Sequence, residues 1–178
     1  MVSFELVGPA VVRAMSCPRC GRGMPLDEAG MVAAQAAWGW CGAVATEADQ
    51  RVGLLLMAAG APTDPRVTMA RIGAAWMAEP YTGRGHGRAL LQTLLGGLSR
   101  AKVATVLAGS EPNRGCAALP AGFLAATGFL PIATSTWRLD LATAVPATKR
   151  SALDQLGRLV QAVRPVAPPE PARRLPIR

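Results

Sequence analysis

The stretch "YTGRGHGRALL", residues 81–91, decides how the rest of the chain is interpreted. Three glycines alternate with Arg84 and His86, and a leucine-rich run follows directly. Glycine reaches backbone conformations that other residues avoid, and it lets a ligand approach the main chain. The start of a helix leaves several N–H groups unpaired and carries partial positive charge. A glycine loop that opens a helix therefore predicts an anion site, most often a phosphate site.

The segments on both sides of the loop predict a strand before it and a helix after it. Residues 67–78 are mostly apolar and are interrupted by Gly73, and a glycine inside a strand often marks a bulge. After the loop, leucines recur at helical spacing, at Leu90, Leu91, Leu94, Leu95 and Leu98. The loop therefore joins a strand to an amphipathic helix.

The remaining elements complete a mixed α/β pattern. A helix is predicted over residues 25–40, with Asp27 as its N-cap and with Met31, Val32, Gln35 and Trp38 at helical spacing. Residues 41–59 predict two short strands joined by a polar turn. Further along, the pattern predicts a strand over 102–109, a short helix over 122–131 closed by Gly128, and an alternating strand over 135–141.

The chain of 178 residues suits one folded domain, which we expect to span residues 1–143. Residues 144–164 contain an amphipathic pattern and predict an appended helix, whose apolar face would pack on the domain or on a second copy. Residues 165–178 are rich in proline and arginine and predict a disordered tail. We expect a monomer or a homodimer.

Composition narrows the classes of function. Hydrophobic residues make up 51% and charged residues 17%, which is typical of a globular chain. The net charge of +8 would suit a nucleic acid or a phosphorylated cofactor, but aromatic residues make up only 4%, so base-stacking platforms are scarce. No apolar run reaches the length of a membrane span, and the first residues do not resemble a signal peptide. We expect a cytoplasmic protein without a nucleic-acid or membrane partner.

The choice of basic residues is a further feature of the composition. Lys102 and Lys149 are the only lysines, and the other basic residues are arginines. With the many alanines, glycines and prolines, this usage is typical of a GC-rich bacterial genome, so part of the positive charge reflects codon bias.

Two common phosphate motifs do not fit the loop. A Walker A loop would require Lys and then Ser or Thr after its last glycine, but Gly87 is followed by Arg88 and Ala89. A dinucleotide fingerprint counted from Gly85 would require Gly or Ala where Leu90 stands. A plain turn, with glycines required by sterics alone, is the remaining alternative.

The loop resembles the acyl-CoA-binding motif of the GNAT acetyltransferase superfamily, Q/R-x-x-G-x-G/A, which falls on residues 82–87. Downstream, "FLAATGFLPI" is similar to the helix that ends in "GF" in that family, and "WRLDL" resembles its final strand. The likeness covers about residues 40–142, the scale of a domain. The span from Cys116 looks like a subgroup of uncharacterised bacterial members. The resemblance implies a mixed central sheet flanked by helices, with a splayed strand pair that holds acyl-CoA.

The resemblance also implies how the coenzyme would be held. The pyrophosphate would lie over the loop amides, and the pantetheine arm would pair with the strand at Ala75–Met77, near a bulge at Gly73. Thr82 stands where the family usually has Gln or Arg, but backbone donors do most of the binding. The expected coenzyme-binding residues are Ala75, Met77, Thr82, Gly83, Arg84, Gly85, His86, Gly87 and Arg88.

The implied activity is transfer of an acetyl group from acetyl-CoA to a primary amine of a small molecule or protein, by direct attack in a ternary complex. Such a step needs a proton acceptor for the amine, and Glu79 and Glu111 are candidates, although both could be surface charges. The tyrosine that many members use as the acid is replaced by Leu124. Cys116 could donate instead, or it could be a small buried residue. A silent acyl-CoA-binding module is the alternative function.

The four cysteines add one further hypothesis. The spacing of Cys17 and Cys20 resembles half of a zinc knuckle. Cys41 could supply a third ligand, and a fourth would have to be Cys116, His86 or a carboxylate. A closed site needs four ligands, and no second C-x-x-C exists in the sequence. Free thiols before the first predicted helix are the simpler interpretation, so no metal is expected.

Overall fold

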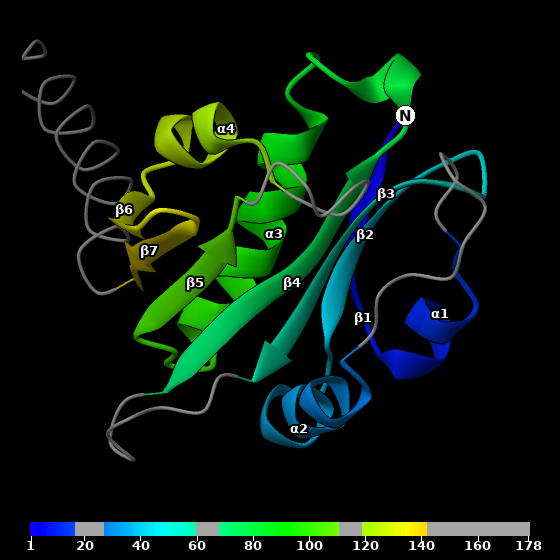
Figure 1. Ribbon diagram of the computed structural model, residues 1–178. Coiled ribbons are helices and arrows are strands. Elements are labelled where there is room, and N and C mark those ends of the chain that lie inside the picture. Colours follow the sequence, from blue (N-terminus) through cyan, green and yellow to red (C-terminus); the bar gives the residue numbers. More distant parts are fainter. Residues whose placement is uncertain (17–26, 60–67, 111–118, 142–178) are drawn as a thin grey trace, which may run out of the picture. The chain divides into compact units, whose positions relative to one another are not determined.

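The computed structural model describes residues 1–16, 27–59, 68–110 and 119–141. All of these residues lie within one compact unit, Met1–Val145. The predicted helix over 144–164 and the predicted tail over 165–178 lie outside the described residues. Within the described residues, the strands form one seven-stranded sheet with the order β1-β2-β3-β4-β5-β7-β6, flanked by helices (Figure 1). The predicted mixed α/β fold is confirmed.

The strands are β1 (Ser3–Val7), β2 (Gly42–Glu47), β3 (Gln50–Ala59), β4 (Met69–Met77), β5 (Thr105–Gly109), β6 (Leu130–Ala133) and β7 (Thr136–Asp140). The helices are α1 (Pro9–Arg13), α2 (Glu28–Trp38), the 3₁₀ turn η1 (Glu79–Tyr81), α3 (His86–Arg100) and α4 (Ala121–Ala126). The sequence pattern predicted neither β1 nor α1, because both are only five residues long and show little periodicity.

One strand pair differs from the others in the described sheet. β4 and β5 run parallel, whereas the other neighbouring strands run antiparallel. A parallel pair cannot be joined by a tight hairpin and needs a crossover connection. That crossover is α3, so the fold itself requires the chain to turn from the end of β4 into a helix at the glycine loop.

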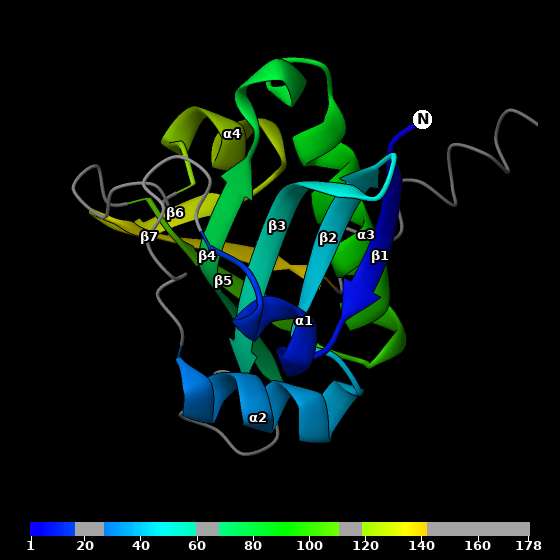
Figure 2. The same cartoon turned by 90° about the vertical axis from the view of Figure 1, so that its right-hand side faces the viewer.

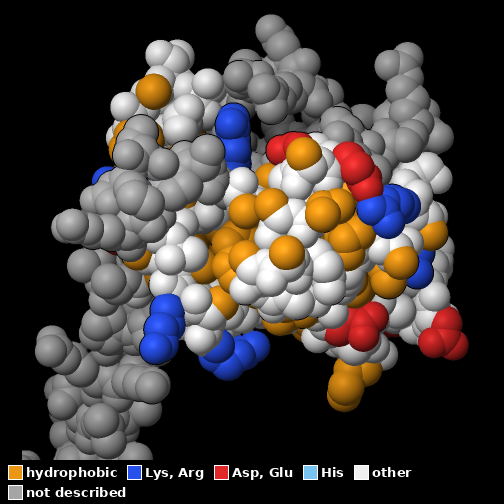
Figure 3. Space-filling model, turned by 90° about the horizontal axis from the view of Figure 1, so that it is seen from below, with side chains coloured by type: hydrophobic (Ala, Val, Ile, Leu, Met, Phe, Trp, Pro, Cys, Tyr) orange, Lys and Arg blue, Asp and Glu red, His pale blue; other side chains and the backbone are white. Residues whose placement is uncertain are grey.

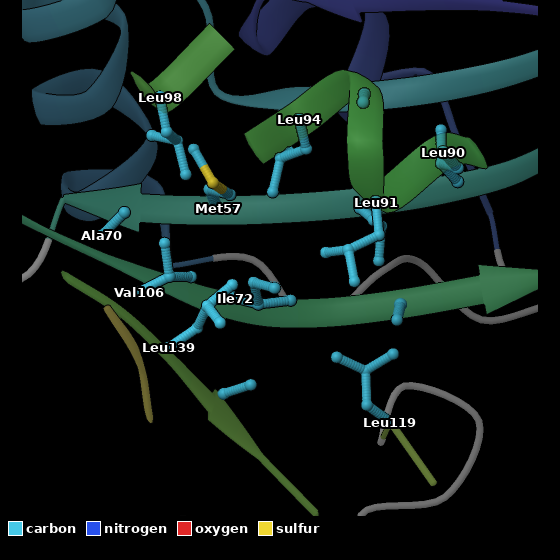
Figure 4. Packing of buried hydrophobic residues seen from close by; sticks show 14 of the residues in the cluster. Met57, Ala70, Ile72, Leu90, Leu91, Leu94, Leu98, Val106, Leu119 and Leu139 are labelled. Atoms are coloured by element: carbon cyan, nitrogen blue, oxygen red, sulfur yellow. The ribbon is translucent and has the colours of Figure 1, made fainter. Parts of the chain in front are cut away.

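The sheet is covered on both faces because its central strands alternate between two cores. The helices α3 and α4 lie on one face of the sheet, and α1 and α2 lie on the other (Figures 1 and 2). Leu55 and Met57 of β3 belong to the buried cluster that contains the leucines of α3, whereas Leu54 and Leu56 belong to the cluster that contains Val12 of α1 and Met31 of α2. Figure 4 shows the leucines of α3 facing the sheet, and Leu90, Leu91, Leu94 and Leu98 are at most 1% exposed. The predicted leucine stripe is confirmed, with Leu95 partly buried at its margin.

α2 has its predicted N-cap but not a simple apolar stripe. Asp27 Oδ1 accepts a hydrogen bond from Gly30 N–H at 3.0 Å. Met31 is buried, whereas Val32 is 51% exposed and Gln35 is exposed as well. Viewed from the side on which α2 lies, hydrophobic side chains gather at the centre of the surface, with charged side chains around them (Figure 3). The exposed small residues of α2 are Ala29, Ala33, Ala36 and Ala37.

Candidate functional site

The two edges of β4 are paired to different extents. On one edge, β4 pairs with β3 over residues 70–77, and a register shift leaves Gly73 as an extra residue on β4. Along β5 its pairing stops at Ile72, which lies opposite Ala108. The predicted bulge at Gly73 is confirmed, and it marks the point where β4 leaves β5.

Beyond this bulge, β4 presents unpaired backbone groups. Ala78 N–H donates to the carbonyl of Val52 at 2.8 Å, so Ala78 directs its backbone groups toward β3. Neighbouring residues of a strand direct their backbone groups to opposite edges, so Met77 and Ala75 direct theirs away from β3. Within the described part of the chain, no strand pairs with that edge. It can therefore accept an extended ligand as an added strand.

The glycine loop follows directly. In η1, Tyr81 N–H donates to Ala78 O at 2.9 Å and Thr82 N–H to Glu79 O at 3.1 Å. Gly83 and Gly85 then adopt φ of +71° and +84°, which L side chains rarely adopt, and an added Cβ at either would meet no atom within 4 Å. Conformation and access, rather than crowding by the protein, therefore require glycine at both positions.

The loop ends at a helix start that has no side-chain cap. Gly85 is the N-cap of α3, no side chain accepts a hydrogen bond there, and the first turn contains no acidic residue. Ala89 N–H is the first to bond within the helix, to Gly85 O at 3.0 Å. The amides of residues 86–88 precede that bond, so they remain available to an anion at the positive end of the helix.

A cavity of about 790 Å³ brings these features together. It lies among the unpaired edge of β4, the glycine loop, the first turn of α3 and one side of α4. Its floor is apolar, with buried Leu55, Leu90 and Leu119 and half-buried Phe123. A long ligand with an anionic part and an apolar part would fit both kinds of lining.

Most residues predicted for the coenzyme line this cavity: Ala75, Met77, Thr82, Gly83, Gly85, Gly87 and Arg88. Arg84 and His86 do not line it; Arg84 is exposed, and His86 lies half-buried near the ring of Tyr81, with centroids 6.0 Å apart. Arg88 Nη2 donates to the carbonyl of Ala126 at 2.9 Å and so joins α3 to α4. The amide and the hydroxyl of Thr82 both donate to Glu79 O. The first loop amide that is available to a ligand is therefore that of Gly83.

The loop is anchored by a hydrogen bond that the sequence did not predict. Tyr81 Oη donates to Glu47 Oε2 at 2.7 Å, from the loop to the end of β2. This bond is the main reason why the pKa of Glu47 is lowered and the pKa of Tyr81 is raised. The two residues are 34 positions apart, and only the pairing of β2, β3 and β4 brings them together. Tyr81 therefore has its proton committed to Glu47, which makes it a poor acid for a thiolate.

The predicted catalytic residues are placed unequally. Glu79 lines the cavity at its loop end and is exposed, whereas Glu111 and Cys116 lie outside the described residues. Leu124, at the position of the usual tyrosine acid, is fully buried in the core, and Phe123 lines the cavity instead. Among the described residues that line the cavity, the titratable ones are Glu79, Tyr81 and Arg88.

The cysteine hypothesis gains no support from the described residues. Cys41 is buried as a free thiol, and burial raises its pKa. Within residues 1–16, 27–59, 68–110 and 119–141, no three His, Cys, Asp or Glu side chains gather as a metal site. Cys17 and Cys20 lie outside these ranges, so the zinc knuckle remains an untested hypothesis.

No helix of the described chain is long and apolar enough to cross a membrane.

Comparisons with known proteins identify the fold. By sequence, no protein-family model matches the chain and no curated protein matches it. By structure, it is similar to a GNAT-family protein from Desulfovibrio desulfuricans, with 20% identity and a TM-score of 0.56, over 79% of this chain and 99% of that one. It is also similar to the ribosomal-protein-S18-alanine N-acetyltransferase of Escherichia coli, with 16% identity and a TM-score of 0.54, over 79% and 94% of the two chains.

A third similar structure is that of the NatC complex bound to Gag peptide and CoA. The likeness has 11% identity and a TM-score of 0.54, over 78% of this chain and 98% of that one. Together these likenesses show that the chain has the fold of the GNAT N-acetyltransferases, as the motif at residues 81–91 predicted.

Proposed function

We propose that this protein is an N-acetyltransferase of the GNAT superfamily that moves an acetyl group from acetyl-CoA to a primary amine. One observation carries the proposal: the unpaired edge of β4 and the uncapped start of α3 face the same cavity. An acyl-CoA has an amide-bearing arm that can pair with a strand and a pyrophosphate that suits a helix start.

The residues present fit such a ligand. Ala75 and Met77 would pair with the pantetheine arm, and the amides from Gly83 to Arg88 would hold the pyrophosphate. Arg84 would add positive charge from the exposed side of the loop, where it has no hydrogen bond or ion pair among the described residues. The fold likeness to a structure bound to CoA supports this arrangement.

Acetyl-CoA would supply the acetyl group as a thioester. In the reaction, the acceptor nitrogen bonds to the carbonyl carbon, the C–S bond breaks with its electrons on sulfur, and the amine loses a proton. The protein would orient the thioester near Ala75, just beyond the point where β4 leaves β5, and would present it to an acceptor in a ternary complex.

Two glutamates are candidates for the proton acceptor of the amine. Glu79 stands four residues beyond Ala75, about 13 Å along an extended chain, so it is closer to the proposed pyrophosphate position. Glu111 follows β5, whose end lies next to the gap between β4 and β5, and it remains a candidate base together with water. Cys116 remains a candidate acid.

The test is a thermal-shift titration with acetyl-CoA, with adenosine as the ligand control. A ligand at a hundred times its dissociation constant adds about 2.7 kcal/mol to stability. The variant Gly87→Val adds methyl groups at a position that lines the cavity, where a Cβ would already lie 3.6 Å from Phe123, and it should abolish the shift. Gly96→Ala, in the same helix but outside the cavity lining, is the matched control and should preserve it.

Turnover then separates an enzyme from a binding module. The wild-type protein should release free thiol from acetyl-CoA when a panel of small amines and peptide N-termini is supplied. Saturable binding without thiol release under any acceptor would favour the silent acyl-CoA-binding module, for which the buried Leu124 is the motivating observation. An absent thermal shift would contradict both.

A further inference from the structure

Glu47, Tyr81, His86 and Phe4 form a cluster at the start of the glycine loop, and Tyr81 also lines the cavity. Tyr81 Oη donates to Glu47 Oε2 at 2.7 Å, and the ring centroid of Tyr81 lies 6.0 Å from that of His86. The ring centroid of Phe4, in β1, lies 6.3 Å from that of His86. The second carboxylate oxygen of Glu47 lies 3.2 Å from the Met1 amine. The cluster therefore ties the start of the loop to the sheet.

The turn between β2 and β3 places Glu47 in this cluster. Ala48 and Asp49 form the turn with φ of +46° and +64°, which is unfavourable for alanine. The register then shifts so that Thr46 lies opposite Arg51 and Ala45 opposite Gly53, which leaves Val52 as an extra residue. Bulges of this kind re-aim side chains at functional sites. Strain at such a turn is retained where a precise position is needed.

The loop needs an anchor of this kind because its own residues provide few side-chain contacts. Gly83 and Gly85 have no side chains to pack, and Arg84 is exposed. Within the described residues, the side-chain hydrogen bonds from the loop to other elements are those of Tyr81 at its entry and Arg88 at its exit. Loss of the Tyr81 bond would free the entry and scatter the amides that follow.

We propose that Glu47 is a positioning residue for the coenzyme, because it accepts the hydrogen bond of Tyr81 and thereby fixes the glycine loop with its amides toward the pyrophosphate. This inference rests on the proposed function. Glu47 is useful here as an acceptor and not as a charge, since a carboxylate near an anion site opposes the anion. The proposal therefore predicts different results for variants that remove the acceptor and variants that remove only the charge.

The experiment compares the affinities of four variants for acetyl-CoA and for S-acetylpantetheine, which lacks the pyrophosphate. Tyr81→Phe and Glu47→Ala should weaken acetyl-CoA binding about tenfold, as expected for losing one hydrogen bond, and should leave the binding of S-acetylpantetheine unchanged. Glu47→Gln keeps an acceptor oxygen and should stay near the wild-type affinity. Asp49→Asn removes a charge from the same turn, tolerates a positive φ, and should also match the wild type.

A second measurement does not depend on the ligand. Amide hydrogen exchange over residues 82–88 in the ligand-free protein should speed up in Tyr81→Phe and Glu47→Ala but not in Glu47→Gln. Equal weakening of both ligands, or equal losses in Glu47→Gln and Glu47→Ala, would overturn the positioning role. Unchanged exchange in Tyr81→Phe would overturn it as well.

The two proposals fail in different ways. If the wild-type protein does not bind acetyl-CoA, the proposed function fails, and the coenzyme role of Glu47 fails with it. If the wild type binds acetyl-CoA and all four variants bind it equally well, only the positioning role fails.

Discussion

The helices α2 and α3 begin in opposite ways. At the start of α2, Asp27 accepts the amide of Gly30 at 3.0 Å, and Glu28 adds negative charge in the first turn. At the start of α3, the N-cap is Gly85, no side chain accepts a hydrogen bond, and the first turn has no acidic residue. Both helices face the same requirement, because each start leaves amides without partners inside the helix.

The difference shows that the unpaired amides of a helix start can contribute to stability in one helix, α2, and to ligand binding in another, α3. α2 satisfies its start with its own side chains, so it offers little to an external anion. α3 leaves its start open toward a cavity, next to a strand edge that is also open. Two unsatisfied backbone surfaces that face one cavity indicate a ligand more strongly than either would alone.

The largest effect should follow from giving α3 the kind of start that α2 has. Gly85→Asp places a carboxylate at the helix start and should weaken acetyl-CoA binding by about a hundredfold or more, through repulsion of the pyrophosphate. Aspartate and asparagine both tolerate positive φ, so Gly85→Asn is the control of equal size and should lose much less. Calorimetric titration measures both. Equal losses in the two variants would mean that bulk, and not charge, is the cause.

A second change separates the body of α3 from its start. At Gly97 an added Cβ would lie 2.7 Å from Trp40 Cζ2 and 2.9 Å from Leu6 Cδ1. Gly97→Ala should therefore destabilise the protein by about 1–3 kcal/mol through overpacking. Gly96→Ala, one position earlier, has space and should stabilise it by up to about 1 kcal/mol. Urea denaturation measures both, and a stable Gly97→Ala variant would contradict the close packing of α3 on β1.

A third change opens the start of α2. Asp27→Ala removes the cap and should cost about 1 kcal/mol of unfolding free energy. Its effect on acetyl-CoA affinity should be negligible, because Asp27 does not line the cavity. Asp27→Asn keeps an acceptor and should retain most of the stability. If Asp27→Ala weakened coenzyme binding as strongly as Gly85→Asp, the contrast between the two helices would be wrong.

The smallest effect concerns the exposed ion pair beside that cap. Arg13 Nε donates to Glu28 Oε1 at 3.0 Å, and the hydrogen bond to Arg13 lowers the pKa of Glu28. A lowered carboxyl pKa in the folded state stabilises the protein above the ordinary pKa, and this stabilisation is lost as the pH falls through the lowered one. The difference in melting temperature between wild type and Glu28→Gln should therefore be small at neutral pH and vanish in acid. A difference that grows in acid would contradict this sign.

Much of the candidate site could be predicted from the sequence because its signals are local. The glycines around Arg84 and the leucines after them lie in one short stretch, and Gly73 interrupts an apolar strand. Each reports a backbone conformation or a buried face within a few residues. The placement of Ala75 and Met77 on an unpaired edge followed from the resemblance and agrees with the pairing of β4 with β3 and β5.

Other parts could not be predicted because the local pattern carries too little information. Nearly every residue of α2 is small or apolar, so periodicity could not tell that Met31 would be buried and Val32 exposed. The direction of Arg88 toward Ala126 depends on where α4 packs. The contact between Glu47 and Tyr81 depends on the register of three strands.

The order of strand, glycine loop and helix could be predicted from residues 67–98 alone, because conformational preference and hydrophobic periodicity act between near neighbours. The open edge of β4, the contact of Glu47 with the loop and the buried face of α2 became visible only in the folded protein. Those outcomes depend on contacts between residues far apart in the chain, and only the packing of the whole sheet brings such residues together.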